Sequence, residues 1–222
     1  MFRFFRCTYR ITGTAAAALA ALCIGYLAAA DQRIDLFNGA NLSDWQPKEF
    51  TGQTQYSLVS ADGRPALLAR SRASASGLYR EIDIDLTQTP YLHWSWRIDN
   101  ILGGHDETAK SGDDYPARVY VVVSGGVFFW RTRAVNYVWS SNRPVGSTWP
   151  NAYTGNAKMI AVRSGGGELG LWREERRNVR DDLRRLFGED ITRINAVAVM
   201  TDSDDTGGAA TAYYGDLYFS AR

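Results

Sequence analysis

Carboxylates concentrate in two polar stretches of this 222-residue sequence. One stretch directly precedes the valine-rich run Ala117–Val123, and the other occupies the turn-rich segment 201–208. Calcium binds several oxygen ligands from carboxylates and loop carbonyls, so these stretches predict a structural calcium site. The segment 201–208 lacks the terminal glutamate of an EF-hand loop, and the alternative is that the acids cap turns or pair with arginines. The five candidate ligands are Asp113, Asp114, Asp202, Asp204 and Asp205.

A second group of candidate residues lies on the polar faces of predicted strands. In Ala117–Val123, alternation places the odd-numbered valines on one face and Arg118 and Tyr120 on the other. In a curved sheet such residues can line a concave groove, where rings stack on sugar faces and charged groups bind hydroxyls. The alternative is a polar, hydrogen-bonded layer under a covering loop. The six residues predicted to bind a saccharide or another envelope component are Arg97, Arg118, Tyr120, Tyr214, Asp216 and Tyr218.

Catalytic candidates are few. A glycan hydrolase needs two carboxylates about 5–10 Å apart on either side of the scissile bond. Asp114 and Glu175 are candidates for such a hydrolase or lyase, but no sequence spacing fixes their separation. The only histidines are His93 and His105, and no GxSxG motif is present, which argues against a serine triad and a zinc centre. The sequence therefore favours a binding protein over an enzyme.

The first thirty residues have the layout of a secretory signal peptide. Three arginines precede the apolar run Ala15–Leu27, and small residues end at Ala30, after which we expect cleavage. Cleavage leaves one domain over residues 31–222, periplasmic or secreted, with no later membrane span and with both cysteines removed. This domain has 22 basic and 24 acidic residues, so it offers no basic field for nucleic acid. Its oligomeric state is not indicated.

The hydrophobic patterning predicts an all-β fold, an antiparallel β-sandwich of jelly-roll type. Tyr91–Ile98 alternates clearly, with two tryptophans on its apolar face, and Val127–Arg131 also reads as a strand. One short helix is expected near residues 178–187. Asn178 is its predicted N-cap and Gly188 ends it.

Four separated blocks carry a family resemblance. KSGDDYPARVYVV, NYVW, LWREERRNVRDDLRRLFGE and VAVMTDSDDTGGAATAYYGDLYF occur in this order. Together they resemble the bacterial exported family called domain of unknown function 3047, from about Trp94 onward. The resemblance implies a jelly-roll sandwich and no particular activity.

Two shorter blocks point to carbohydrate. DLFNGANLSDW looks like the start of concanavalin-like sandwich domains, and Tyr213–Phe219 is similar to the last strand of galactose-binding-like modules. Both resemblances imply a carbohydrate-associated sandwich. We therefore expect a saccharide-binding module, with a glycan hydrolase or lyase and a structural or interaction protein of the envelope as alternatives.

Overall fold

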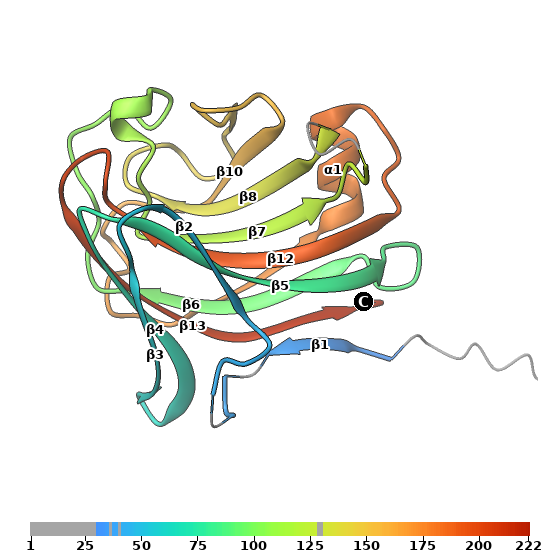
Figure 1. Ribbon diagram of the computed structural model, residues 1–222, viewed down its shortest axis with the longest axis horizontal. Helices are drawn as coiled ribbons and strands as arrows, with labels where there is room; N and C mark the ends of the chain where they lie inside the picture. Colours follow the sequence, from blue (N-terminus) through green and yellow to red (C-terminus); the bar gives the residue numbers. More distant parts are fainter. Residues whose placement is uncertain (1–29, 36, 40, 128–130) are drawn as a thin grey trace, which may run out of the picture.

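The computed structural model describes residues 30–35, 37–39, 41–127 and 131–222, and Figure 1 shows them. In these residues two β-sheets pack face to face, with one α-helix at one end of the sandwich. The predicted all-β, antiparallel sandwich is confirmed. The predicted signal peptide, apart from Ala30, and the centre of the strand predicted over residues 127–131 lie outside the described residues. No helix in the described part of the chain is long and apolar enough to cross a membrane.

Sheet A has the order β11-β6-β13-β4-β3, and β1 pairs with β13. All of these pairs are antiparallel. Its strands are β1 (Gln32–Asp35), β3 (Gln55–Ala61), β4 (Arg64–Arg72), β6 (Tyr91–Ile98), β11 (Arg173–Asn178) and β13 (Ala209–Ser220).

Sheet B has the order β2-β5-β12-β7-β8-β10-β9. Its pairs are antiparallel except for β8 and β10, which run parallel. Its strands are β2 (Gln46–Thr51), β5 (Ala75–Asp85), β7 (Ala117–Val123), β8 (Arg133–Ser140), β9 (Thr148–Pro150), β10 (Ala157–Ser164) and β12 (Arg193–Asp202).

The core between the sheets follows the predicted alternation. Trp94 and Trp96 of β6 are at most 2% exposed, and their rings meet edge to face with centroids 5.4 Å apart. Tyr137 and Trp139 of β8 approach them from sheet B at 5.2 and 5.7 Å. These aromatic contacts between the sheets hold the two layers together, because large buried rings contribute most to such a core.

The helix α1 (Val179–Phe187) confirms both predicted ends. The side chain of Asn178 accepts a hydrogen bond from the backbone N–H of Asp181 at 3.2 Å, and Gly188 ends the helix at φ 71°. A left-handed conformation at this position favours glycine. Val179 and Leu183 are fully buried against the main core, which fixes the helix to the sandwich.

A second, smaller core covers part of the outer face of sheet B. Tyr115, from the loop before β7, and Trp149, of the short strand β9, pack on Val138, Met159 and Ala161 of β8 and β10. The loop before β7 includes a short 3-10 turn, η1 (Lys110–Gly112). These loops cover the β8–β10 end of the outer face and leave the part over β5, β12 and β7 open (Figure 1).

Candidate functional site

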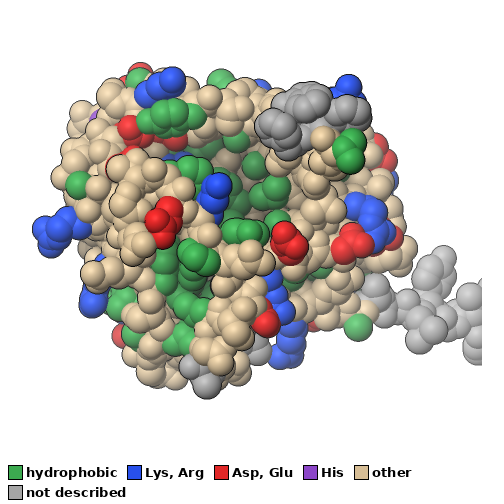
Figure 2. Space-filling view, viewed as in Figure 1, with side chains coloured by type: hydrophobic (Ala, Val, Ile, Leu, Met, Phe, Trp, Pro, Cys, Tyr) green, Lys and Arg blue, Asp and Glu red, His purple; other side chains and the backbone are tan. Residues whose placement is uncertain are grey.

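The open part of sheet B is hollowed into a groove of about 1000 Å³, which we call the sheet B groove. Its shape follows from residue size along three neighbouring strands. Ala198 on β12 lies in register between Tyr79 on β5 and Tyr120 on β7. A methyl group between two phenol rings leaves a depression in the sheet surface, which Figure 2 shows as a hollow with hydrophobic side chains on its floor.

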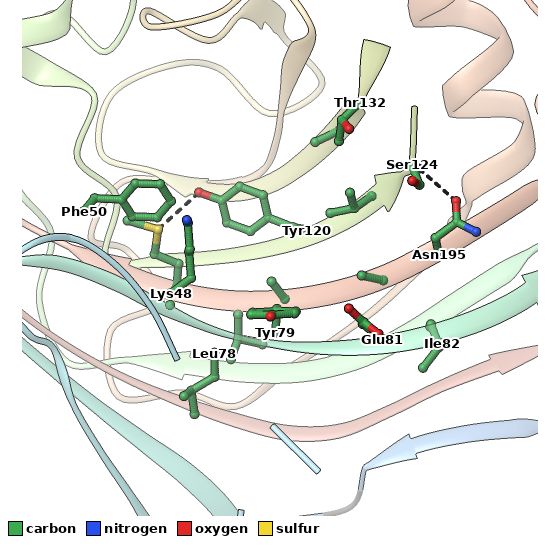
Figure 3. Close-up of a pocket in the computed structure, with 17 residues that line it drawn as sticks. Lys48, Phe50, Leu78, Tyr79, Glu81, Ile82, Tyr120, Ser124, Thr132 and Asn195 are labelled. Carbon is green, nitrogen blue, oxygen red and sulfur yellow. Dashed lines mark hydrogen bonds between the residues drawn. The ribbon is translucent and has the colours of Figure 1, made fainter. Parts of the chain in front are cut away.

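Polar and aromatic side chains surround this floor (Figure 3). Lys48 and Phe50 come from the edge strand β2, and Glu81 follows Tyr79 along β5. Phe50 is 65% exposed, unusually high for a phenylalanine ring beside a cavity. At the other end Asn195 accepts a hydrogen bond from the Ser124 backbone at 2.8 Å. The groove thus combines ring faces with charged and amide groups.

A second cavity, the acidic pocket, has a volume of about 390 Å³. It shares Phe50, Tyr120 and Met200 with the lining of the sheet B groove, so it continues the groove toward the loops. Tyr153, which is 56% exposed, stands on its loop side. The acids and amides of its lining are Asp113, Asp202, Asp204, Asp205, Asn136 and Asn151.

Arg118 organises the acidic pocket. Its Nε and Nη2 donate to the two carboxylate oxygens of Asp202, with Nε–Oδ1 at 2.8 Å, and Nη2 also donates to the Asp113 carbonyl. Nη1 lies 3.3 Å from the Tyr120 hydroxyl, and the guanidinium stacks over the Tyr115 ring at 4.3 Å. Arg118 is only 3% exposed. It is therefore a positioning residue that fixes Tyr120 and the pocket acids, and it has little surface left for a ligand.

Three of the five predicted calcium ligands converge. Carboxylate oxygens of Asp114, Asp202 and Asp204 lie within 4.8 Å of one another. Asp114 already accepts hydrogen bonds from the backbone N–H groups of Asp205 and Thr206, at 3.3 and 2.6 Å, which ties the loop after β12 to the entrance of β7.

The net charge around this cluster is negative and would attract a cation. The five acids face one guanidinium in the pocket lining, that of Arg118. Burial raises the pKa of the Asp113 carboxyl, and burial also raises the pKa of Asp205, with help from its acidic neighbours. Oxygen donors in this number suit calcium, while the Asp202–Arg118 pair would compete with it. Calcium binding stays a prediction.

The six residues predicted to share one binding face do not do so. Arg118 and Tyr120 line the cavities of sheet B, whereas Arg97, Tyr214, Asp216 and Tyr218 belong to sheet A. Tyr214 is fully buried in the core and donates to the Met200 carbonyl at 2.6 Å. Its predicted orientation is wrong because a bulge between Gly215 and Leu217 reverses the alternation of β13.

The other three sheet A residues are occupied locally. Arg97 pairs with Asp62 and Asp99 at 2.8 and 2.9 Å. Tyr218 stacks on His93 with ring centroids 4.5 Å apart, and Asp216 lines a small cavity of about 120 Å³ beside them. Whether any of these residues binds a ligand stays a prediction, but they cannot act with Arg118 and Tyr120 in one groove.

The two candidate catalytic acids are not brought together. Glu175 lies on β11 of sheet A, where it accepts hydrogen bonds from Trp96 Nε1 at 3.1 Å and Arg163 Nε at 2.6 Å. Asp114 lies at the entrance of β7 in sheet B and is held by the loop after β12. Glu175 therefore closes an edge of the sandwich, and the two carboxylates do not flank a common cleft.

Sequence reasoning missed most of the groove lining. Tyr79 and Glu81 could have been found, because polar and apolar residues alternate along Gly77–Leu86 and place both side chains on one polar face. Lys48 and Phe50 could not be recognised as part of a groove, because β2 is exposed along its whole length and its sequence QPKEFT has no apolar alternation. Asn195 could not be assigned to the outer face because a register shift between Ile194 and Ala196 interrupts the alternation of β12.

Comparisons with known proteins give one family and several distant structures. The model of a family described as "Protein of unknown function (DUF3047)" matches residues 43–218. No curated protein matches the sequence at a significant level.

Solved structures similar to this chain include two modules from Clostridium thermocellum. A family 11 carbohydrate-binding module, in complex with a β-1,3-1,4-mixed-linked tetrasaccharide, has a TM-score of 0.46 and 9% identity, and the match covers 86% of this chain and 95% of that chain. A family 30 carbohydrate-binding module of a cellulosomal cellulase has a TM-score of 0.47 and 11% identity, covering 81% and 92%.

A third similar structure is the xyloglucanase domain of NopAA, a type three effector from Sinorhizobium fredii, in complex with cellobiose. Its TM-score is 0.45 at 8% identity, covering 82% of this chain and 96% of that chain. Because all three TM-scores are below 0.5, this similarity gives no information on ligand or activity.

Proposed function

This chain belongs to the DUF3047 family of proteins of unknown function, and we propose that it binds a saccharide chain in the sheet B groove. The observation that carries the proposal is the row Tyr79–Ala198–Tyr120, in which two partly exposed rings flank a depression in an open sheet. Aliphatic C–H faces of pyranose rings pack well on such rings. The adjacent Lys48 and Glu81 offer a donor and an acceptor for hydroxyl groups.

The dimensions favour an extended ligand. A volume of about 1000 Å³ is at the upper end for small-molecule sites, and the acidic pocket continues the same channel. Phe50 stands where the two cavities join, so one exposed ring could contact a chain that occupies both. Several sugar units in a row fit this arrangement better than a single small metabolite.

We also infer that the protein acts outside the cytoplasm, on a component of the cell envelope or an external polysaccharide. The support is the arginine-rich start, the apolar run Ala15–Leu27 and the small residues before Asp31. Sequencing the N-terminus of the protein from the periplasm or medium should give Asp31 as the first residue. A cytoplasmic protein that keeps Met1 would contradict export.

The test of binding uses a glycan array followed by calorimetry on the best oligosaccharide. Tyr79→Ala should weaken binding about 2- to 12-fold, because one aromatic contact contributes about 0.5–1.5 kcal/mol beyond its buried area. Tyr120→Ala should do the same, while Tyr120→Phe keeps the ring and most of the affinity.

Tyr213→Ala is the matched control, because Tyr213 is also a partly exposed tyrosine on an outer face, but on sheet A. It should leave affinity unchanged. The proposal fails if no envelope or external polysaccharide binds, or if Tyr213→Ala removes binding and Tyr79→Ala does not.

A further inference from the structure

We propose that the acidic pocket recognises the protonated amino group of an amino sugar, as a subsite of the sheet B groove. This inference deepens the proposed function and rests on it. It assigns a substrate class: a polysaccharide that carries free, non-acetylated amines. Four independent features of the pocket support it: its charge, its unpaired acceptors, its size and its exposed rings.

The lining of the pocket is strongly acidic. Asp113, Asp202, Asp204 and Asp205 are part of it, and Arg118 is the single basic residue among its described lining residues. The guanidinium of Arg118 is committed to both oxygens of Asp202. Asp113 also lies near this guanidinium, with its Oδ2 3.6 Å from Arg118 Nη1. Asp204 and Asp205 therefore remain without a basic partner among the described lining residues, and a cationic group is what such a cavity attracts.

Two buried acceptors in the lining have no partner in the described part of the chain. Asn136 is 1% exposed and its Oδ1 accepts no hydrogen bond. Asp113 is 4% exposed; its Oδ2 accepts from Asn151 at 2.7 Å, but its Oδ1 accepts nothing. Buried polar atoms are normally paired, so two unpaired acceptors lining one cavity indicate a missing donor. An ammonium group supplies three N–H donors and one positive charge.

The size and rings of the pocket select a sugar rather than a bare ion. A volume of about 390 Å³ is far larger than one metal ion needs and is sufficient for a sugar unit with some water. Phe50 and Tyr153 present exposed rings at its rim. Tyr153 is fixed by its hydroxyl, which donates to Asp205 at 2.6 Å. A pyranose between these rings would point an amine toward the carboxylates.

A calcium ion at Asp114, Asp202 and Asp204 would not remove this preference. Five carboxylates with one guanidinium carry a formal charge of about −4, and a divalent cation would leave about −2. The subsite is therefore expected to work with or without calcium, and the experiment includes both conditions.

The test measures affinity by calorimetry for three β-1,4-linked oligosaccharides of equal length. They are a glucosamine oligomer, its N-acetylated form and a glucose oligomer, at mildly acidic pH so that the amines are protonated. We expect the glucosamine oligomer to bind about tenfold more tightly than the other two, because charge-assisted hydrogen bonds are about twice as strong as neutral ones. Asp205→Asn should remove most of this affinity ratio, because it removes a negative charge from the pocket. The amide Oδ1 can still accept the hydrogen bond from Tyr153, so the position of the Tyr153 ring is kept.

Asp83→Asn is the control, because Asp83 is an exposed acid on β5 outside the lining of both the groove and the pocket. It should leave the ratio unchanged. Equal affinity for all three oligomers overturns the subsite and leaves the groove proposal standing. Absence of binding by all three, together with a negative glycan array, overturns both. A ratio that disappears when calcium is added also overturns the subsite, because the acids would then serve the metal alone.

Discussion

Replacing Arg118 by methionine should destabilise the protein strongly. The side chains of Arg118 and Asp202 are 4% and 3% exposed and form a bidentate ion pair. Removing one partner of a buried pair costs about 3–5 kcal/mol, because the other charge stays buried without compensation. In a domain of this size, 1 kcal/mol corresponds to about 2–4 °C, so Tm should fall by about 6–20 °C.

The assay is urea unfolding followed by tryptophan fluorescence, with two comparison variants. Arg193→Met breaks the exposed pair with Asp83, whose side chains are 54% and 62% exposed, and should cost at most about 1 kcal/mol. The double variant Arg118→Met/Asp202→Asn should recover part of the loss, because Asp202 no longer leaves a buried charge without a partner. The recovery is incomplete, because Asp113 also loses its pairing with Arg118.

The pH dependence gives a further check on the same pair. Burial raises the pKa of Asp202, and removing Arg118 takes away the charge that opposes this effect. In the single variant Asp202 is therefore protonated more readily in the folded state, so the destabilisation should shrink as the pH is lowered. A loss below about 1 kcal/mol at neutral pH, or a double variant no more stable than the single one, would refute the role given to this pair.

Three further predictions concern calcium, a buried acid and the helix. Calcium at 100-fold excess over its Kd should raise Tm by about 5–10 °C. A chelator should reverse the rise and Asp204→Asn should abolish it, whereas identical melting curves with and without calcium would contradict a calcium site. Burial raises the pKa of Glu107 above 4.5, so the stability it contributes is present at low pH and is lost as the pH rises. In urea unfolding, Glu107→Gln should therefore become more stable relative to the native protein as the pH rises from acidic to neutral. A stability difference between the two proteins that does not change with pH would argue against this. Asn178→Ala should cost about 1 kcal/mol in the same assay by removing the N-cap of α1. Gln55→Ala, at an exposed position of β3, serves as the comparison.

Alternation was sufficient to predict the sandwich. The faces of Tyr91–Ile98 and Ala117–Val123 are as predicted, because both strands are regular and each has one face in the core. The helix ends were also predictable, since Asn178 and Gly188 act through local backbone geometry. Such features depend on neighbours in the sequence.

The candidate site depends on contacts between residues far apart in the sequence, which local sequence patterns do not reveal. The bulge at Gly215 reversed the orientation of Tyr214, and a single inserted residue has no clear signal in one sequence. The pairing of β12 with both β5 and β7 placed Ala198 between two tyrosines that are 41 residues apart in sequence. The sequence assigned Asp114 and Asp204 to one acidic site but not the distance between them. The loop after β12 donates backbone hydrogen bonds to Asp114, and this contact brings the two carboxylates together.

The most direct test of the central claim is a crystal structure of the protein with the tightest-binding oligosaccharide from the array. We predict that the saccharide lies across Ala198, between Tyr79 and Tyr120, and extends past Phe50 toward Asn136. A saccharide seated on the outer face of sheet A, beside Tyr213 and away from these rings, would contradict it.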